Sequence, residues 1–112
     1  MIRATANLDA GGCLLRFRAS GHAEAGNQGY DLVCAAFSIL ARTAYRAFEA
    51  LPGVEVRGSA PEPGSLSFEL LKPGTNTERA VGIGDFLITG LGDLARDYPD
   101  SVVFVLERDW RG

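Results

Sequence analysis

The sequence predicts an α+β fold, a two-layer sandwich in which a five-stranded sheet carries two helices. Five segments show the alternating or continuous apolar character of strands, and two longer segments carry apolar residues at three- and four-residue steps. Their order along the chain is strand, strand, helix, strand, strand, helix, strand. The chain has 112 residues, of which 46% are hydrophobic and 22% charged, and no composition change divides it. We therefore expect a single domain over residues 1–112.

The first two predicted strands form a hairpin. In residues 2–8 every second side chain, beginning with Ile2, is apolar, which is the period of a strand with one buried face. Residues 9–12, Asp-Ala-Gly-Gly, have the composition of a turn. In residues 13–19 the alternation continues and assigns to the buried face Cys13, Leu15, Phe17 and Ala19. Cys13 is thus expected to be a small core residue.

The first helix is predicted to begin after Asp31, a favourable N-cap, and to continue through Ala50 before Pro52 and Gly53 stop it. Cys34 then lies in the first helical turn. At about 100° per residue, it falls roughly a quarter turn from the centre of the buried stripe, on a flank that can face a cleft. The stripe itself comprises Val33, Phe37, Leu40, Ala44, Phe48 and Leu51.

The second half repeats the hairpin-and-helix order. Residues 54–58 and 65–71 are predicted strands joined by a turn rich in proline and glycine. A helix follows, which Thr75 and Glu78 would open with a capping box, and its four glycines are expected to make close helix contacts. Residues 102–106 are continuously apolar, which is typical of a central strand covered on both faces or of an interface.

Cys34 and His22, the only histidine in the chain, are candidate catalytic residues. His22 would stand just beyond the end of the second strand, and residues 23–30 have the composition of an exposed, mobile loop. The first turn of a helix stabilises an anion, and the thiolate is the reactive form of cysteine. The alternative is that Cys34 is a packed thiol, because free cysteine is among the most buried residue types.

The string GHA, followed by a short polar loop and then GYDLVCAAFS, resembles the ribosomal-processing cysteine protease family called Prp. In that family a GHA motif and a D-[IL]-V-C-A-A-x-S helix start supply the catalytic pair. The resemblance implies that His22 is the general base and Cys34 the nucleophile. It also places Gly21, Asp31 and Ser38 at motif positions that support catalysis or bind substrate.

The resemblance further implies a cysteine endopeptidase that removes a short N-terminal extension from a large-subunit ribosomal protein and thereby supports ribosome assembly. It also implies a homodimer, for which the sequence offers the apolar last strand and the glycine-rich helix as candidate surfaces. The N–H groups of the first helical turn would then be the oxyanion donors. One departure from the family pattern is Phe37, which stands where a smaller aliphatic residue is expected and would reshape the floor beneath Cys34.

Composition argues against nucleic-acid-binding, membrane-spanning and metal-binding proteins. The net charge is −3, and lysine and arginine form no runs, so we expect no direct nucleic-acid partner. No apolar run approaches the roughly 20 residues that span a membrane, and Met1-Ile2-Arg3 opens a strand pattern without a signal-peptide segment. The expected location is the cytoplasm, with both cysteines reduced. Two cysteines without CxxC spacing indicate neither a metal site nor a cofactor.

Two other classes of function stay open from the sequence. One is a non-catalytic, ribosome-associated binding module in which the His22 loop is a recognition loop. The other is a thiol redox or acyl-transfer enzyme that uses Cys34 alone.

Overall fold

The computed structural model describes residues 1–21, 30–60, 65–72, 74 and 76–111. It confirms the α+β class and the predicted order of elements. Most boundaries fall within one residue of the prediction. The elements are β1 (Ile2–Leu8), β2 (Leu14–Ser20), α1 (Tyr30–Ala50), β3 (Glu55–Ser59), β4 (Ser65–Lys72), α2 (Thr77–Asp97) and β5 (Val102–Glu107).

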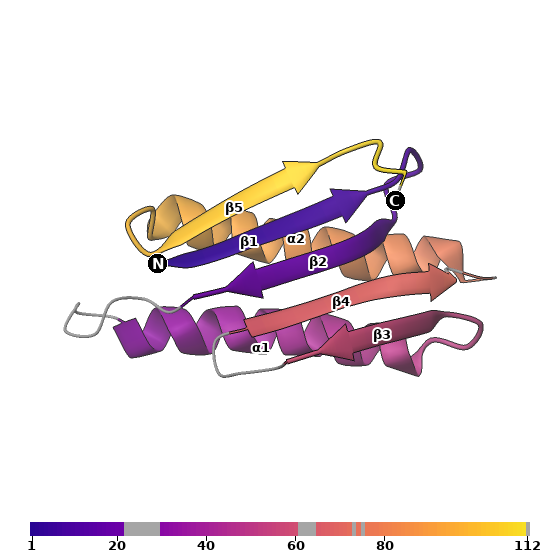
Figure 1. Cartoon of the computed structure of the whole chain (residues 1–112), viewed down its shortest axis with the longest axis horizontal. Coiled ribbons are helices and arrows are strands. Elements are labelled where there is room, and N and C mark those ends of the chain that lie inside the picture. Colours follow the sequence, from indigo (N-terminus) through magenta and orange to yellow (C-terminus); the bar gives the residue numbers. More distant parts are fainter. Residues whose placement is uncertain (22–29, 61–64, 73, 75, 112) are drawn as a thin grey trace.

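The five strands form one mixed sheet in the order β3-β4-β2-β1-β5. All neighbouring pairs are antiparallel except β1 and β5, which run parallel with Ile2 opposite Val102. Both helices cover the same face, with α2 behind β5, β1 and β2 and α1 behind β4 and β3 (Figure 1). The prediction that β5 could be a central strand is wrong. It lies at the sheet's edge, where the side chain of Val105 is 47% exposed.

An irregularity between β1 and β2 changes which residues of β2 enter the core. Asn7 is opposite Arg16, but the next residue, Leu8, is opposite Leu14, so Leu15 is an extra residue in the second strand. Such a bulge reverses the alternation beyond it. Leu14 is therefore fully buried and Leu15 only partly, which corrects the inward set predicted from strict alternation.

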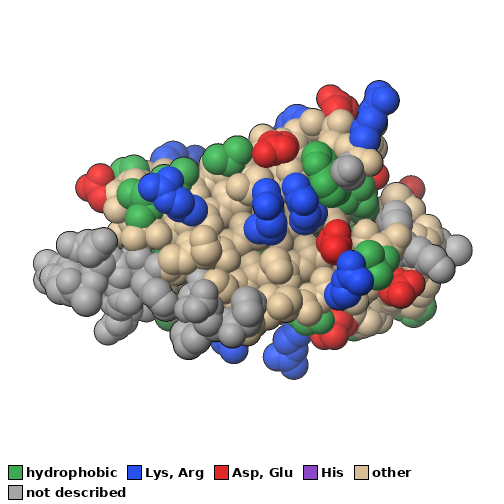
Figure 2. Space-filling model, viewed as in Figure 1, with side chains coloured by type: hydrophobic (Ala, Val, Ile, Leu, Met, Phe, Trp, Pro, Cys, Tyr) green, Lys and Arg blue, Asp and Glu red, His purple; other side chains and the backbone are tan. Residues whose placement is uncertain are grey.

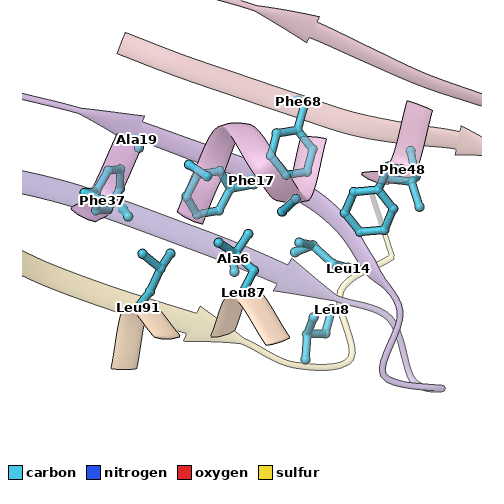
Figure 3. Close-up of a cluster of buried hydrophobic side chains, with 14 of the residues drawn as sticks. Ala6, Leu8, Leu14, Phe17, Ala19, Phe37, Phe48, Phe68, Leu87 and Leu91 are labelled. Carbon is cyan, nitrogen blue, oxygen red and sulfur yellow. The ribbon is translucent and has the colours of Figure 1, made fainter. Parts of the chain in front are cut away.

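Aromatic rings join α1 to the sheet. The ring of Phe68 on β4 lies 5.3 Å from that of Phe17, 5.8 Å from that of Phe48 and 5.7 Å from that of Tyr45, measured between centroids. Phe37 extends the cluster toward the start of α1, at 6.4 Å from Phe17. Figure 3 shows the four phenylalanine rings between α1 and the strands, while Leu87 and Leu91 of α2 approach the sheet beside them.

The glycines of α2 divide into two kinds. A Cβ atom on Gly84 would come within 3.1 Å of the Leu14 side chain, and one on Gly90 within 3.0 Å of Leu40 on α1. These two confirm the expected close contacts, because they let the helix approach the sheet and its neighbouring helix. A Cβ on Gly82 or Gly92 would meet nothing within 4 Å, so the expectation of close contacts is wrong for that pair.

The N-cap of α2 is Asn76, one residue after the Thr75 predicted to open the capping box, and the Asn76 side chain makes no capping hydrogen bond. The Asn76 amide instead donates a hydrogen bond to the carbonyl of Pro52, which ties the start of α2 to the end of α1. Thr75 lies outside the described residues. None of the helices in the described part of the chain combines the length and apolarity needed to cross a membrane.

Neither helix of the described residues covers the other face of the sheet, where charged side chains lie among hydrophobic and other ones (Figure 2). A network of side-chain contacts lies on this face at the end of β1. Asn7 is fully buried, donates to Glu107 at 2.9 Å, and accepts from Arg16 Nε at 3.0 Å. Arg16 also stacks on the ring of Trp110, with its Cζ 4.4 Å from the centroid. This network fastens the chain after β5 onto the open face.

Phe68→Ala is expected to lower the free energy of unfolding by about 3–5 kcal/mol, because it empties the centre of the ring cluster. The measurement is the urea midpoint followed by circular dichroism. Leu71→Ala on the same strand is the control: Leu71 is 43% exposed, and its loss should cost about 0.5 kcal/mol or less. Similar losses for the two variants would contradict the assigned role of the cluster.

Candidate active site

Helix α1 begins at Tyr30, so Asp31 lies inside the helix and the N-cap role predicted for it is wrong. Only the first four N–H groups of an α-helix lack an acceptor within the helix. In α1 the described members of this group are residues 30–32, whereas Cys34 is the fifth helical residue. The free N–H groups of the first turn therefore precede Cys34 and do not include its own.

Cys34 lines a cleft of about 410 Å³ at the end of the sheet where β2 leaves and β4 enters. Its side chain is partly buried and packs against the core from the flank of the helix, as the predicted quarter-turn offset requires. The thiol thus borders open space as well as the core. The cleft is lined by Ile2, Ala19, Gly21, Cys34, Phe37, Ser38, Ala41, Arg42, Ala60, Ser65 and Leu66.

Both the sheet and α1 contribute apolar side chains to the cleft, and its polar side chains are Ser38, Arg42 and Ser65. Phe37 is 7% exposed and held by its contact with Phe17, so it forms part of the wall beside Cys34. Ser38, one turn after Cys34, is exposed. An apolar side chain of a ligand can therefore be buried against Phe37 while the hydroxyl of Ser38 remains available for a hydrogen bond.

Gly21 has a structural reason to be glycine. Its φ is +100°, a conformation that other residues rarely adopt. A Cβ atom there would also collide with the backbone carbonyl of Met1. Gly21 therefore brings the chain out of β2 past the start of β1, at the wall of the cleft.

The structure brings together three of the five predicted site residues, Gly21, Cys34 and Ser38, around one cleft. His22 and residues 23–29 of the predicted loop lie outside the described residues, as does the side chain of Asp31. The loop prediction is wrong for Tyr30, which is the first residue of α1. Sequence reasoning missed Arg42 as a site residue. The available signal was its spacing, because Cys34, Ser38 and Arg42 follow one another at four-residue steps on one helix face.

Cys13, the other cysteine, is a core residue as predicted. Its side chain is 1% exposed, and burial, with a smaller contribution from the charge of Asp9, raises the pKa of its thiol. Both cysteines are free. Within the described part of the chain, no three His, Cys, Asp or Glu side chains gather where they could hold a metal ion.

The two thiols are expected to differ sharply in reactivity. Iodoacetamide should alkylate Cys34 in the folded protein, whereas Cys13 should react more slowly by roughly a hundredfold or more, because its exposure requires opening of the core. Peptide mapping by mass spectrometry measures both rates, and urea-unfolded protein provides the control in which the two should react similarly. Comparable rates in the folded protein would contradict the placement of Cys34 at the cleft.

Comparisons with known proteins agree with this geometry. The fold is similar to that of SMU.848 from Streptococcus mutans, with a TM-score of 0.79 and 29% identity over 96% of this chain and 95% of that one. It is also similar to an essential ribosomal processing protease Prp from S. aureus. The complex with a covalently linked product peptide gives a TM-score of 0.80 at 20% identity, and the complex with a substrate peptide gives 0.78 at 18%. Each covers 96% of this chain and 100% of the other.

No protein of curated function matches the sequence significantly. The sequence model of the family described as cysteine protease Prp, however, matches residues 1–103, nearly the whole chain. That match includes the cleft, its cysteine and the motif that precedes it. The chain therefore belongs to the cysteine protease Prp family.

Proposed function

We propose that His22 and Cys34 form the catalytic pair of this cysteine protease. His22 takes the proton from the Cys34 thiol, and the thiolate sulfur attacks the carbonyl carbon of the scissile peptide bond. The C–N bond then breaks, the leaving amine takes the proton from His22, and a thioester joins the peptide to Cys34. Water, activated by the same imidazole, hydrolyses the thioester and restores the thiol.

The observation that carries this proposal is the position of Cys34, a free thiol on the wall of a cleft large enough for several side chains. His22 follows directly after Gly21, which lines the same cleft. The N–H groups of the first turn of α1, residues 30–32, are the proposed donors to the developing oxyanion. Ser38 is proposed to contact the substrate, and Asp31 to support the start of the helix or His22.

We propose that the substrate is the N-terminal extension of a large-subunit ribosomal protein and that cleavage takes place in the cytoplasm. The S. aureus protein of similar fold is described as a ribosomal processing protease. The apolar wall of the cleft suits an extended peptide with a bulky apolar or aromatic side chain just before the cut. Burial of such a side chain stabilises the complex by about 1.5–3 kcal/mol.

Replacing either member of the pair should stop processing without unfolding the protein. Cys34→Ala should abolish cleavage, and His22→Ala should lower kcat by roughly 10²–10⁴, the usual contribution of a general base. The assay follows the shortening of a ribosomal protein that bears an N-terminal extension. Cys13→Ala is the matched control and should keep the wild-type cleavage rate in whatever fraction remains folded. If Cys34→Ala or His22→Ala cleaved at the wild-type rate, the catalytic pair would be refuted. If the wild-type protein bound the extension but did not cleave it, a recognition module would be favoured.

We further propose that the protein is a homodimer joined through the outer faces of α1 and α2. An apolar groove of about 820 Å³ runs between these helices, and its wall includes Phe86 and Ile39, which are 71% and 56% exposed. Exposed apolar area of this kind marks an interaction site. Gly82 lies one turn before Phe86 on the same groove and leaves open space there. A bulky ring beside a gap suits a twofold interface, in which each Phe86 enters the space above the partner's Gly82.

Sedimentation velocity tests the dimer and its surface. Phe86→Asp should convert the dimer to a monomer, because a carboxylate would be buried without a partner at the contact. Val105→Asp, on the exposed edge strand β5, should leave the dimer intact. The opposite pattern would move the interface to β5, and a monomeric wild-type protein would exclude the dimer.

A further inference from the structure

The reaction does not account for the role of Arg42 at the cleft. Among the described residues that line the cleft, Arg42 is the only charged side chain, and the others are Cys34 and apolar residues, glycine or serine. Two arginines elsewhere in the chain are held in ion pairs. Arg57 is paired with Glu69 at 3.1 Å and Arg96 with Asp93 at 2.7 Å. Within the described part of the chain, neither of these pairs involves Arg42, and no hydrogen bond from its guanidinium is found.

The position of Arg42 relative to the nucleophile follows from the helix. Cys34, Ser38 and Arg42 lie at four-residue steps, and all three line the cleft. At about 1.5 Å of rise per residue, the Cα atom of Arg42 is roughly 12 Å from that of Cys34 along α1. An extended peptide advances about 3.3 Å per residue. A peptide lying along this side of the helix would therefore bring the third or fourth residue from the attacked carbonyl to Arg42.

We propose that Arg42 is a specificity-determining residue that forms a subsite for a peptide side chain ending in an oxygen acceptor. A guanidinium has five N–H donors and no acceptor, so it binds carboxylate and carboxamide oxygens and repels lysine and arginine. The subsite takes Asp, Glu, Asn or Gln three or four residues from the scissile bond, and Ser38 between Cys34 and Arg42 adds a hydroxyl. This inference deepens the proposed peptidase function and relies on it only for the substrate.

A set of affinity labels tests the subsite without requiring proteolysis. Each label is a bromoacetyl group followed by two or three glycines and then by Glu, Gln, Ala or Lys as a C-terminal amide. The Cys34 thiolate displaces bromide, so an S–C bond forms as the C–Br bond breaks, and mass spectrometry gives the rate. The Glu and Gln labels should react about tenfold or more faster than the Lys label at low label concentration, which is the range of a hydrogen bond to a charged group.

Variants of α1 separate a binding role from a structural one. Arg42→Ala should reduce the ratio of Glu to Lys labelling to about one, and Arg42→Glu should reverse it. Arg46→Ala is the matched control, because Arg46 is an exposed cation one turn further along α1 that does not line the cleft. It should keep the wild-type ratio. If added salt slows labelling by the Glu probe but not by the Gln probe, Arg42 binds a carboxylate. If the two probes react at equal rates, Arg42 binds either a carboxylate or a carboxamide oxygen.

The same substitutions applied to a cleaved peptide provide the second readout. Changing one residue at a time to Glu, Gln, Ala or Lys should reveal a single position, three or four residues from the cut, where kcat/KM depends on Arg42. Equal labelling by all four probes in the wild-type protein, or a ratio unchanged in Arg42→Ala, would overturn the subsite. Selective labelling without any peptide cleavage would instead leave the subsite standing and refute the proposed peptidase function.

Discussion

The packing of phenylalanine rings between α1 and the sheet is the interaction on which the cleft depends. Phe17, Phe48 and Phe68 fix the rotation of α1 about its axis, since all three are almost fully buried. Once the inner stripe is fixed, the flank a quarter turn away must face the end of the sheet. Cys34 therefore reaches the cleft because of residues up to fourteen positions further along the same helix.

Local sequence patterns predicted the elements and failed where tertiary contacts decide the details. The period of two cannot reveal the extra residue Leu15, because the bulge depends on how β2 pairs with β1. Asn76 caps α2 without a hydrogen bond to it, since its amide bonds to the end of the other helix. The apolar run of β5 did not show whether the strand is central or at an edge, because both environments bury one face.

The part of the candidate site that lies on one helix could be predicted from the sequence. Cys34 and Ser38 are one turn apart on α1, so helical geometry alone places them together. The rest of the cleft comes from β1, β2, the end of β3 and the start of β4, which only the sheet order brings to the same place. Arg42 was missed for this reason. On the helix alone it is an exposed cation, and it lines a cleft only because the fold brings Ala60 and Ser65 to the same site.

The parallel pairing of β1 with β5 links the first and last strands of the chain. The Ile2 N–H donates to the carbonyl of Ser101 at 2.8 Å, and the side chain of Ile2 lines the cleft. During synthesis the β1–β2 hairpin can form early, but the outer edge of β1 has no partner until residues 102–107 leave the ribosome. The wall that holds Ile2 is therefore among the last parts to become rigid. A nascent chain that already contains Cys34 still lacks a finished cleft, so protein synthesis itself delays the appearance of a working thiol protease.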